Sequence, residues 1–181
     1  FKIIKNNQII FTHCHSSAVS QALAYAKKHG KKFEVYNTET RPLYQGRITA
    51  KELSKAGIKV TDFIDSAMHE AIEKSSIILL GADAILKTGV INKIGSTSAA
   101  EIANVHKKPL YIVSDSWKFY PKIIKIENRN PREIWKIKNK NIKIENPAFE
   151  KVPPKYIKAI ISELGILSHK QFIKLASKLR I

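Results

Sequence analysis

The sequence has few of the features that mark secreted or membrane proteins. Its 181 residues include one cysteine, Cys14, which excludes an internal disulfide framework and suggests a reducing compartment. No apolar stretch approaches the roughly 18 residues that span a bilayer. The first residues form neither an extended apolar region nor a small-residue cleavage site, which argues against a signal peptide. We therefore expect a cytoplasmic protein. The chain does not begin with Met, so we also expect residues upstream.

Runs of like charge are also absent, although the chain is strongly basic. Lys and Arg number 32 against 15 Asp and Glu, which gives a net charge of +17. Such an excess suits a nucleic acid, an acidic membrane face or an anionic small substrate. Yet no five consecutive residues carry the same charge, no RNA-binding motif is present, and aromatic residues make up only 8%. We expect a solvated, lysine-rich surface and an anionic substrate, with nucleic acid and membrane not among the partners.

Short apolar segments alternate with amphipathic segments over the first two thirds of the chain. We expect strands at 8–12, 33–37, 58–61, 77–80 and 110–113, and helices at 18–29, 49–57, 65–74 and from 98 onward. Thr49 to Glu52 form a capping-box pattern, and Asp65 or Ser66 is the expected cap of the third helix. This alternation predicts an α/β fold, with a parallel sheet covered by helices on both faces.

After Pro121 the alternation weakens, because four further prolines interrupt it. Lysines alternate with other residues over 136–143, which predicts a strand with its lysines in water. Two helices are expected at about 155–164 and 168–178. Since no repeat or Gly/Ser linker is present, we expect a main domain over 1–125 and a C-terminal helical extension over 126–181 that packs on it.

The segment after the first expected strand carries the single cysteine. Cys14 stands between His13 and His15, just before Ser16 or Ser17 caps the next helix. A helix N-terminus favours a thiolate and also binds anions. A simpler interpretation is an inert buried cysteine at a strand end. Zinc bound by His13, Cys14 and His15 is disfavoured, because adjacent residues of an extended chain point to opposite faces.

Asp83 follows the most apolar of the expected strands, at residues 77–80. Chemistry in open parallel sheets sits at the carboxyl ends of the strands, so an acid placed there faces the crevice. Burial would raise its pKa and leave it able to donate a proton at neutral pH. The alternative is that Asp83 only caps a turn or a helix.

Two further segments suit anion binding. Asn92 and Lys93 precede a glycine and small hydroxyl residues just before an expected helix, a pattern that can cradle a phosphate, although it is no Walker motif. Arg41 and Arg47 follow the second expected strand and are otherwise ordinary surface residues.

Four of these segments together resemble a known superfamily. It joins ribose-1,5-bisphosphate isomerase, methylthioribose-1-phosphate isomerase and the regulatory subunits of translation initiation factor 2B. The matching stretches, in order, are THCHSSA (12–18), ETRPLYQGR (39–47), GADAILKTGVINKIGS (81–96) and SWKF (116–119). The resemblance implies that residues 1–125 form a Rossmann-like catalytic domain that needs no cofactor and no metal.

The cysteine and the aspartate separate the branches of this superfamily. Initiation-factor subunits generally lack both, whereas this chain has Cys14 and Asp83. The methylthioribose-phosphate branch usually continues from its cysteine with Asn-Thr-Gly, whereas here His15, Ser16 and Ser17 follow. The segment is more similar to the ribose-1,5-bisphosphate isomerases of archaeal AMP metabolism. The resemblance thus implies an aldose–ketose isomerase, an intramolecular oxidoreductase, that forms ribulose 1,5-bisphosphate; a non-catalytic initiation-factor-like subunit and a methylthioribose-1-phosphate isomerase are the alternatives.

The expected chemistry gives each residue a role. A sugar phosphorylated at carbon 1 cannot open to a free aldehyde, so its ring oxygen must be protonated as the ring opens. Asp83 is the candidate acid. Cys14, with a modestly lowered pKa, is the candidate base that takes the proton from carbon 2. The alternative mechanism is a hydride shift between carbons 2 and 1, in which Cys14 and Asp83 would have different roles. By resemblance, Asn92 and Lys93 contact the substrate and Lys118 a phosphate; Ser16 and Ser17 can offer donors, and Arg41 is a weaker candidate.

Members of this superfamily usually carry an N-terminal helical domain that holds part of the substrate. This chain begins at the first strand of the catalytic domain, so we expect that helical domain to be absent from it. Either upstream residues are missing, or a separate chain supplies them, or the activity is lost. The resemblance also implies a homo-oligomer, a dimer or larger.

Overall fold

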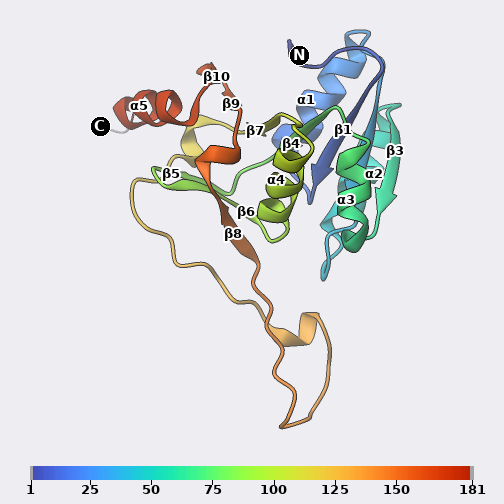
Figure 1. Cartoon of the computed structure of the whole chain (residues 1–181), viewed down its shortest axis with the longest axis vertical. Coiled ribbons are helices and arrows are strands. Elements are labelled where there is room, and N and C mark those ends of the chain that lie inside the picture. Colours follow the sequence, from blue (N-terminus) through green and yellow to red (C-terminus); the bar gives the residue numbers. More distant parts are fainter. Residues whose placement is uncertain (1, 180–181) are drawn as a thin grey trace.

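The protein is built on a seven-stranded sheet, seen in a computed structural model that describes residues 2–179 (Figure 1). The strand order is β10-β9-β7-β4-β1-β2-β3, and every neighbouring pair is parallel except β9 with β10. The strands are β1 (Gln8–His13), β2 (Phe33–Thr38), β3 (Lys59–Phe63), β4 (Ile77–Leu80), β7 (Leu110–Val113), β9 (Ala159–Ser162) and β10 (Gly165–Leu167). The predicted α/β fold with a largely parallel sheet is confirmed.

Helices cover both faces of this sheet. They are α1 (Ser17–Lys28), α2 (Gln45–Lys55), α3 (Met68–Glu73), α4 (Ser96–Val105) and α5 (His169–Leu179). One core cluster contains residues of α1 and α2, and the other contains residues of α3, α4 and α5. Successive residues of the central strands alternate between the two clusters, as Ile77 and Ile78 do in β4. The strands are therefore apolar on both faces, which explains their continuous apolar runs.

A second, three-stranded antiparallel sheet was not predicted from the sequence. It contains β5 (Ala84–Leu86), β6 (Gly89–Lys93) and β8 (Phe149–Val152), in the order β5-β6-β8. The β5–β6 hairpin occupies the segment between β4 and α4 that was expected to be a loop. All three residues of β5 and all five of β6 are buried. Because β8 comes from much later in the chain, no local pattern could reveal this sheet.

The helix expected at 155–164 is wrong. Pro154–Tyr156 form one 3-10 turn, and β9 and β10 follow. Strand β9 pairs in parallel with β7, whose backbone would otherwise be the open edge of the sheet. The gain from completing this ladder outweighs the helical preference of the segment. The helix expected at 168–178 is confirmed as α5.

The strand expected at 136–143 is also wrong, since these residues are irregular and mostly exposed. They belong to an arm, residues 121–147, that leaves the body as a long loop between β7 and β8 (Figure 1). Within the arm, Arg129 forms an ion pair with Glu133, and the Asn146 side-chain amide donates to Asn130 O at 3.0 Å. A strand needs a partner, and no other described segment lies beside 136–143 to form one.

Three helix starts differ from the predictions. Helix α2 begins at Gln45, so Thr49 lies inside it and does not cap it. Helix α4 begins at Ser96, two residues earlier than expected. A 3-10 turn, Asp65–Ala67, precedes α3, and the Asp65 carboxylate accepts from backbone N–H groups of another loop. Thr49 and Asp65, which the local sequence pattern predicts as helix caps, therefore do not act as caps, and Asp65 forms hydrogen bonds to a distant part of the chain instead. No helix among residues 2–179 is long and apolar enough to cross a membrane.

The packing of α2 against β2 generates the first prediction. A Cβ atom built at Gly46 would lie 1.8 Å from the Thr38 carbonyl oxygen. Gly46→Ala must therefore push α2 away from the sheet and should lower the free energy of unfolding by about 1–3 kcal/mol. Urea denaturation followed by circular dichroism would measure the change.

Ser54→Ala provides the matched control, because Ser54 is exposed on the same helix. It should change the free energy of unfolding by no more than about 0.5 kcal/mol. An unchanged midpoint for Gly46→Ala would contradict the close contact between α2 and β2.

Candidate active site

The candidate site lies where the order of the strands reverses. Strand β2 lies on one side of β1 and β4 on the other, so the loops that leave β1 and β4 diverge at their carboxyl ends. A cavity of about 220 Å³ opens there. Of the residues predicted from the sequence it is lined by Ser16, Ser17, Asp83, Asn92 and Lys118. Segments from four distant parts of the sequence therefore meet at one edge of the sheet.

Cys14 follows β1 directly and has an unusual backbone conformation. Its φ angle is +66°, in the left-handed region that non-glycine residues rarely adopt. Two threonine hydroxyls hold it there. Cys14 N–H donates to Thr40 Oγ1 at 3.0 Å, and Thr49 Oγ1 donates to the Cys14 carbonyl oxygen at 2.9 Å. Strain of this kind persists only where the surroundings impose it, and it concentrates at functional sites.

The pKa of the Cys14 thiol is raised to about 11, mainly because burial disfavours the thiolate. The nearby positive charge of Lys93 acts in the opposite direction and is the smaller effect, while Asp83 and Asp65 add to the increase. The lowered pKa expected from the sequence is therefore wrong. Cys14 lies before the cap of α1, Ser16, and its desolvation exceeds any benefit from the helix terminus.

Asp83 follows β4 and is exposed at the mouth of the cavity. Its N–H donates to Ile91 O at 2.9 Å, which joins the end of β4 to the β5–β6 hairpin. The neighbouring protein atoms partly desolvate its carboxyl group and raise its pKa, and the positive charges of Lys118 and Lys93 oppose this. The predicted direction of the pKa shift is confirmed. Asp83 begins no helix, and its carboxylate accepts no hydrogen bond from any residue in the described range.

Asn92 and Lys93 end strand β6 and are both buried. The Asn92 amide donates to Ser96 Oγ at 2.9 Å, and Ser96 Oγ donates to Lys93 O at 2.6 Å, so the strand end and the start of α4 form one unit. Lys93 is only 5% exposed and forms no ion pair within residues 2–179. A buried ammonium group without a counter-ion favours a bound anion.

The first turn of α1 and the turn after β7 complete the cavity wall. Ser16 caps α1 by accepting from Val19 N–H at 3.4 Å, and Ser17 is the first helical residue. Lys118 ends the 3-10 turn Ser116–Lys118 and is exposed. A helix N-terminus opposite a lysine suits a phosphate group.

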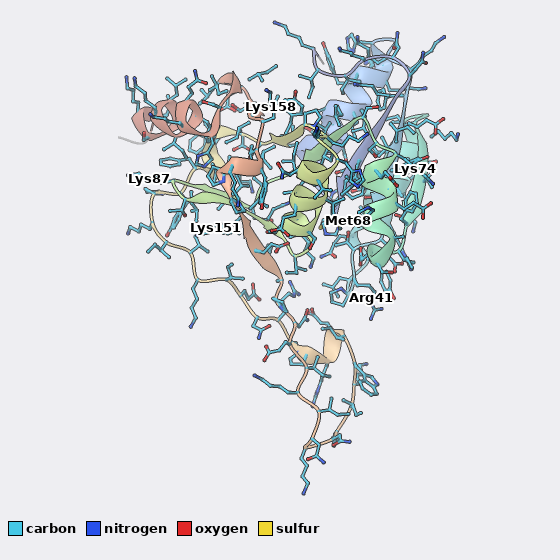
Figure 2. All side chains as sticks on the ribbon, in the orientation of Figure 1. Arg41, Met68, Lys74, Lys87, Lys151 and Lys158 are labelled. Atoms are coloured by element: carbon cyan, nitrogen blue, oxygen red, sulfur yellow. The ribbon has the colours of Figure 1, made fainter. Side chains whose placement is uncertain are left out.

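Arg41 is not brought into this cavity. It lines a separate hollow of about 440 Å³, together with Asp65 and Met68 among others. Figure 2 shows Arg41 and Met68 on the same side of the molecule. The Arg41 guanidinium donates to the Tyr44 hydroxyl and lies 5.1 Å from the centre of its ring. Cys14 does not line the 220 Å³ cavity either, although the negative charge of Asp83 contributes to the raised pKa of its thiol.

Sequence reasoning missed the structural role of His13. Its ring contacts the Thr38 hydroxyl through Nδ1 and Ile94 O through Nε2, the latter at 2.8 Å. Burial lowers its pKa, so the ring is neutral, with Nε2–H donating to Ile94 O. Gly95 has φ +99°, and a Cβ atom there would lie 2.7 Å from His13 Nε2. The glycine in this segment therefore makes room for the histidine that joins β1 to the start of α4.

His15 points into a different environment from His13. Its Nδ1 lies 3.1 Å from Thr49 Oγ1, on helix α2. Within the described range, no group of three or more His, Cys, Asp or Glu side chains is arranged to hold a metal ion. The chemistry that this arrangement can perform is proton transfer beside a bound anion.

Proteins with known names are similar to this chain over most of its length. Ribose 1,5-bisphosphate isomerase of Methanocaldococcus jannaschii is 44% identical over 172 residues, which cover 91% of this chain and 56% of that protein. The enzyme of the same name from Thermococcus kodakarensis is 40% identical, with 92% and 55% covered. The chain thus spans a little over half the length of these curated relatives.

Solved structures are also similar to this chain over nearly its whole length. The translation initiation factor eIF-2B of Pyrococcus horikoshii superimposes with a TM-score of 0.86 at 32% identity, over 95% of this chain and 62% of that one. The 5-methylthioribose 1-phosphate isomerase of the same organism gives 0.88 at 26% identity, over 97% and 56%. A family model, described as the initiation factor 2 subunit family, matches residues 1–169. The chain therefore belongs to the initiation factor 2 subunit family.

Proposed function

We propose that the chain carries the catalytic centre of a sugar-phosphate isomerase that converts ribose 1,5-bisphosphate to ribulose 1,5-bisphosphate. One observation carries the proposal: Asp83, Asn92, Lys118 and the first turn of α1 line one cavity at the carboxyl ends of the strands. The buried Lys93, which forms no ion pair within residues 2–179, lowers the pKa of both Asp83 and Cys14. The names of the relatives from M. jannaschii and T. kodakarensis support the choice of substrate. Such a reaction would serve the salvage of nucleotides such as AMP.

Asp83 is the proposed acid. Its raised pKa keeps a larger fraction of the carboxyl group protonated than in an ordinary aspartate, and its place at the cavity mouth exposes it to the substrate. The proton passes to the ring oxygen as the bond between that oxygen and carbon 1 breaks. The positive charges of Lys93 and Lys118 then stabilise the carboxylate that remains.

Cys14 is the proposed base. Its thiolate takes the proton from carbon 2, which leaves an enol phosphate. The Cys14 thiol then returns a proton to carbon 1 while the carbon-2 hydroxyl loses its proton to the Asp83 carboxylate, which gives the ketose and restores both groups. With a pKa of about 11, the thiolate is a minor species near neutral pH, on the order of one molecule in 10⁴ at pH 7. Once formed it is a stronger base than an ordinary thiolate, and Lys93 stabilises it. Because the reaction also needs Asp83 in its protonated form, a higher pH forms more thiolate but removes the acid, so turnover should be nearly independent of pH between the two pKa values.

The two phosphates need cationic and N–H donors. We assign one of them to Lys118 and the first turn of α1, where Ser16 and Ser17 lie, and place the other near Lys93 and Asn92. Arg41 is left out, because it lines a different hollow. Since the relatives are nearly twice as long as the matched region, segments outside these residues are expected to complete the substrate site.

An initiation-factor-like role is the second candidate, favoured by the likeness to the P. horikoshii factor. A non-catalytic subunit would bind an initiation-factor partner whether or not Cys14 and Asp83 were intact. Methylthioribose 1-phosphate is the alternative substrate, favoured by the P. horikoshii isomerase. It has one phosphate instead of two, so it makes less use of the cationic groups.

Self-association is also proposed, and the arm of residues 121–147 supports it. Ile123 is 96% exposed and Trp135 is 54% exposed on this arm, which projects from the body (Figure 1). A second copy of the chain would bury these side chains. No role in binding nucleic acid or membrane is proposed.

Substitution of the acid and of the base tests the isomerase proposal. Cys14→Ser and Asp83→Asn should each lower the turnover of ribose 1,5-bisphosphate by about 10²-fold or more, because each removes a proton-transfer group. Calorimetric binding of the substrate should change only a few-fold. Lys87→Ala, in the exposed β5–β6 turn, serves as the control and should leave turnover unchanged. Full turnover in either site variant would refute the assignment.

The raised pKa of Cys14 can be measured directly, because it is the only thiol. The rate of alkylation by iodoacetamide follows the thiolate and should rise with pH toward an inflection near 11. Lys93→Met removes the positive charge that stabilises the thiolate, so its inflection should lie at higher pH. Circular dichroism at each pH would verify folding. An inflection below the ordinary value for a cysteine would show that desolvation does not dominate this site.

A further inference from the structure

Asp115 has no assigned role in the proposed chemistry, although it lines the same cavity as Asp83. It follows β7, the third parallel strand whose carboxyl end reaches this edge of the sheet. The cavity therefore contains a second carboxylate opposite groups that bind anions. A second negative charge in a cavity that is proposed to bind an anion would weaken that binding unless the carboxylate contacts another group of the ligand.

A carboxylate at this position normally accepts a hydrogen bond from the backbone of the next turn. Asp115 is the cap of the 3-10 turn Ser116–Lys118, and an aspartate at a cap usually accepts a hydrogen bond from a backbone N–H of the turn. Here it makes no such bond. Glu163, in the turn between β9 and β10, accepts from Ser116 N–H through both carboxylate oxygens, at 3.0 and 3.2 Å. Ser116 is the first residue of the turn, and no N–H of the turn, neither this one nor those that follow, donates to the Asp115 carboxylate.

The carboxylate has no other partner within residues 2–179. Its Oδ1 atom is buried and accepts no hydrogen bond, and the structure shows no ion pair with Lys118. A desolvated acceptor without a donor is unfavourable unless a ligand supplies the donor. The required ligand group is a hydrogen-bond donor, because a carboxylate can only accept.

We propose that Asp115 accepts a hydrogen bond from a hydroxyl group of the bound sugar and thereby selects a sugar phosphate over a free phosphate. The inference rests on the proposed function, since it places the sugar in this cavity. Inorganic phosphate places its full negative charge directly beside Asp115 and Asp83 and is repelled by them, whereas the hydroxyl group of a sugar is neutral and donates. Lys118 and the first turn of α1, which line the same cavity, bind a phosphate of the same ligand.

Two ligands with opposite expected responses test this role. Isothermal titration calorimetry would measure ribose 1,5-bisphosphate and inorganic phosphate binding to the wild-type chain, Asp115→Ala and Asp115→Asn. Asp115→Ala should weaken binding of the sugar bisphosphate by about 10- to 100-fold, because a charge-assisted hydrogen bond is lost. The same variant should bind inorganic phosphate at least as tightly as the wild type, because a repelling charge is gone. Asp115→Asn keeps an acceptor oxygen and should recover part of the sugar affinity.

Glu101→Ala is the matched control, because it removes one negative charge from the exposed face of α4, away from the cavity. It should leave both affinities unchanged. Equal weakening of both ligands in Asp115→Ala and in Asp115→Asn would indicate a structural role and overturn the proposal. A wild-type chain that binds phosphate but no sugar bisphosphate would also overturn it.

Binding measurements test the role of Asp115, and turnover measurements test the isomerase proposal, so the two proposals can fail independently. Binding that follows the expected pattern without any turnover would support the role of Asp115 and count against the isomerase proposal alone. If Asp115→Ala fails to fold, as judged by circular dichroism, Asp115→Asn carries the test. It should then show weaker sugar binding with unweakened phosphate binding, and the absence of that difference would refute the role.

Discussion

The parallel pairing of β1 with β4 is the constraint on which both the core and the site depend. These strands are central in the sheet and contribute Ile10, Phe11, Ile78 and Leu80 to the cores, all fully buried. The chain reaches β4 only after it has built β2 and β3 on the other side of β1. The loops after β1 and β4 must therefore part, and Cys14 and Asp83 lie in these two loops, directly after β1 and shortly after β4.

Desolvation and positive charge act against each other at Cys14 and Asp83. The protein around Cys14 and Asp83 raises the pKa of both groups, while the charge of Lys93 lowers both. Desolvation is the larger effect in each case. Both groups are thereby biased toward their protonated forms in the unliganded protein, and Lys93 limits that bias.

The site is held by contacts between loops as much as by the strands. Thr40 and Thr49 keep Cys14 in the left-handed region, and the neutral ring of His13 joins β1 to the start of α4. Glu163 accepts a hydrogen bond from Ser116 N–H, at the start of the turn that follows Asp115. Each of these partners comes from a part of the chain at least 25 residues away. The second sheet adds Asn92 to the cavity wall through the β5–β6 hairpin and buries Lys93 next to it.

The sequence by itself determined the α/β class, the five parallel strands over the first two thirds, and the placement of Cys14 and Asp83 after β1 and β4. It could do so because apolar runs and glycine stops are local signals. Only the tertiary structure decided the rest. Strands β8, β9 and β10 form because distant edges needed hydrogen-bond partners, and Thr49 and Asp65 serve contacts other than the caps that their positions favour, while Asp115 makes no cap hydrogen bond. The direction of the Cys14 pKa shift also depended on burial by distant residues, which no spacing in the sequence records.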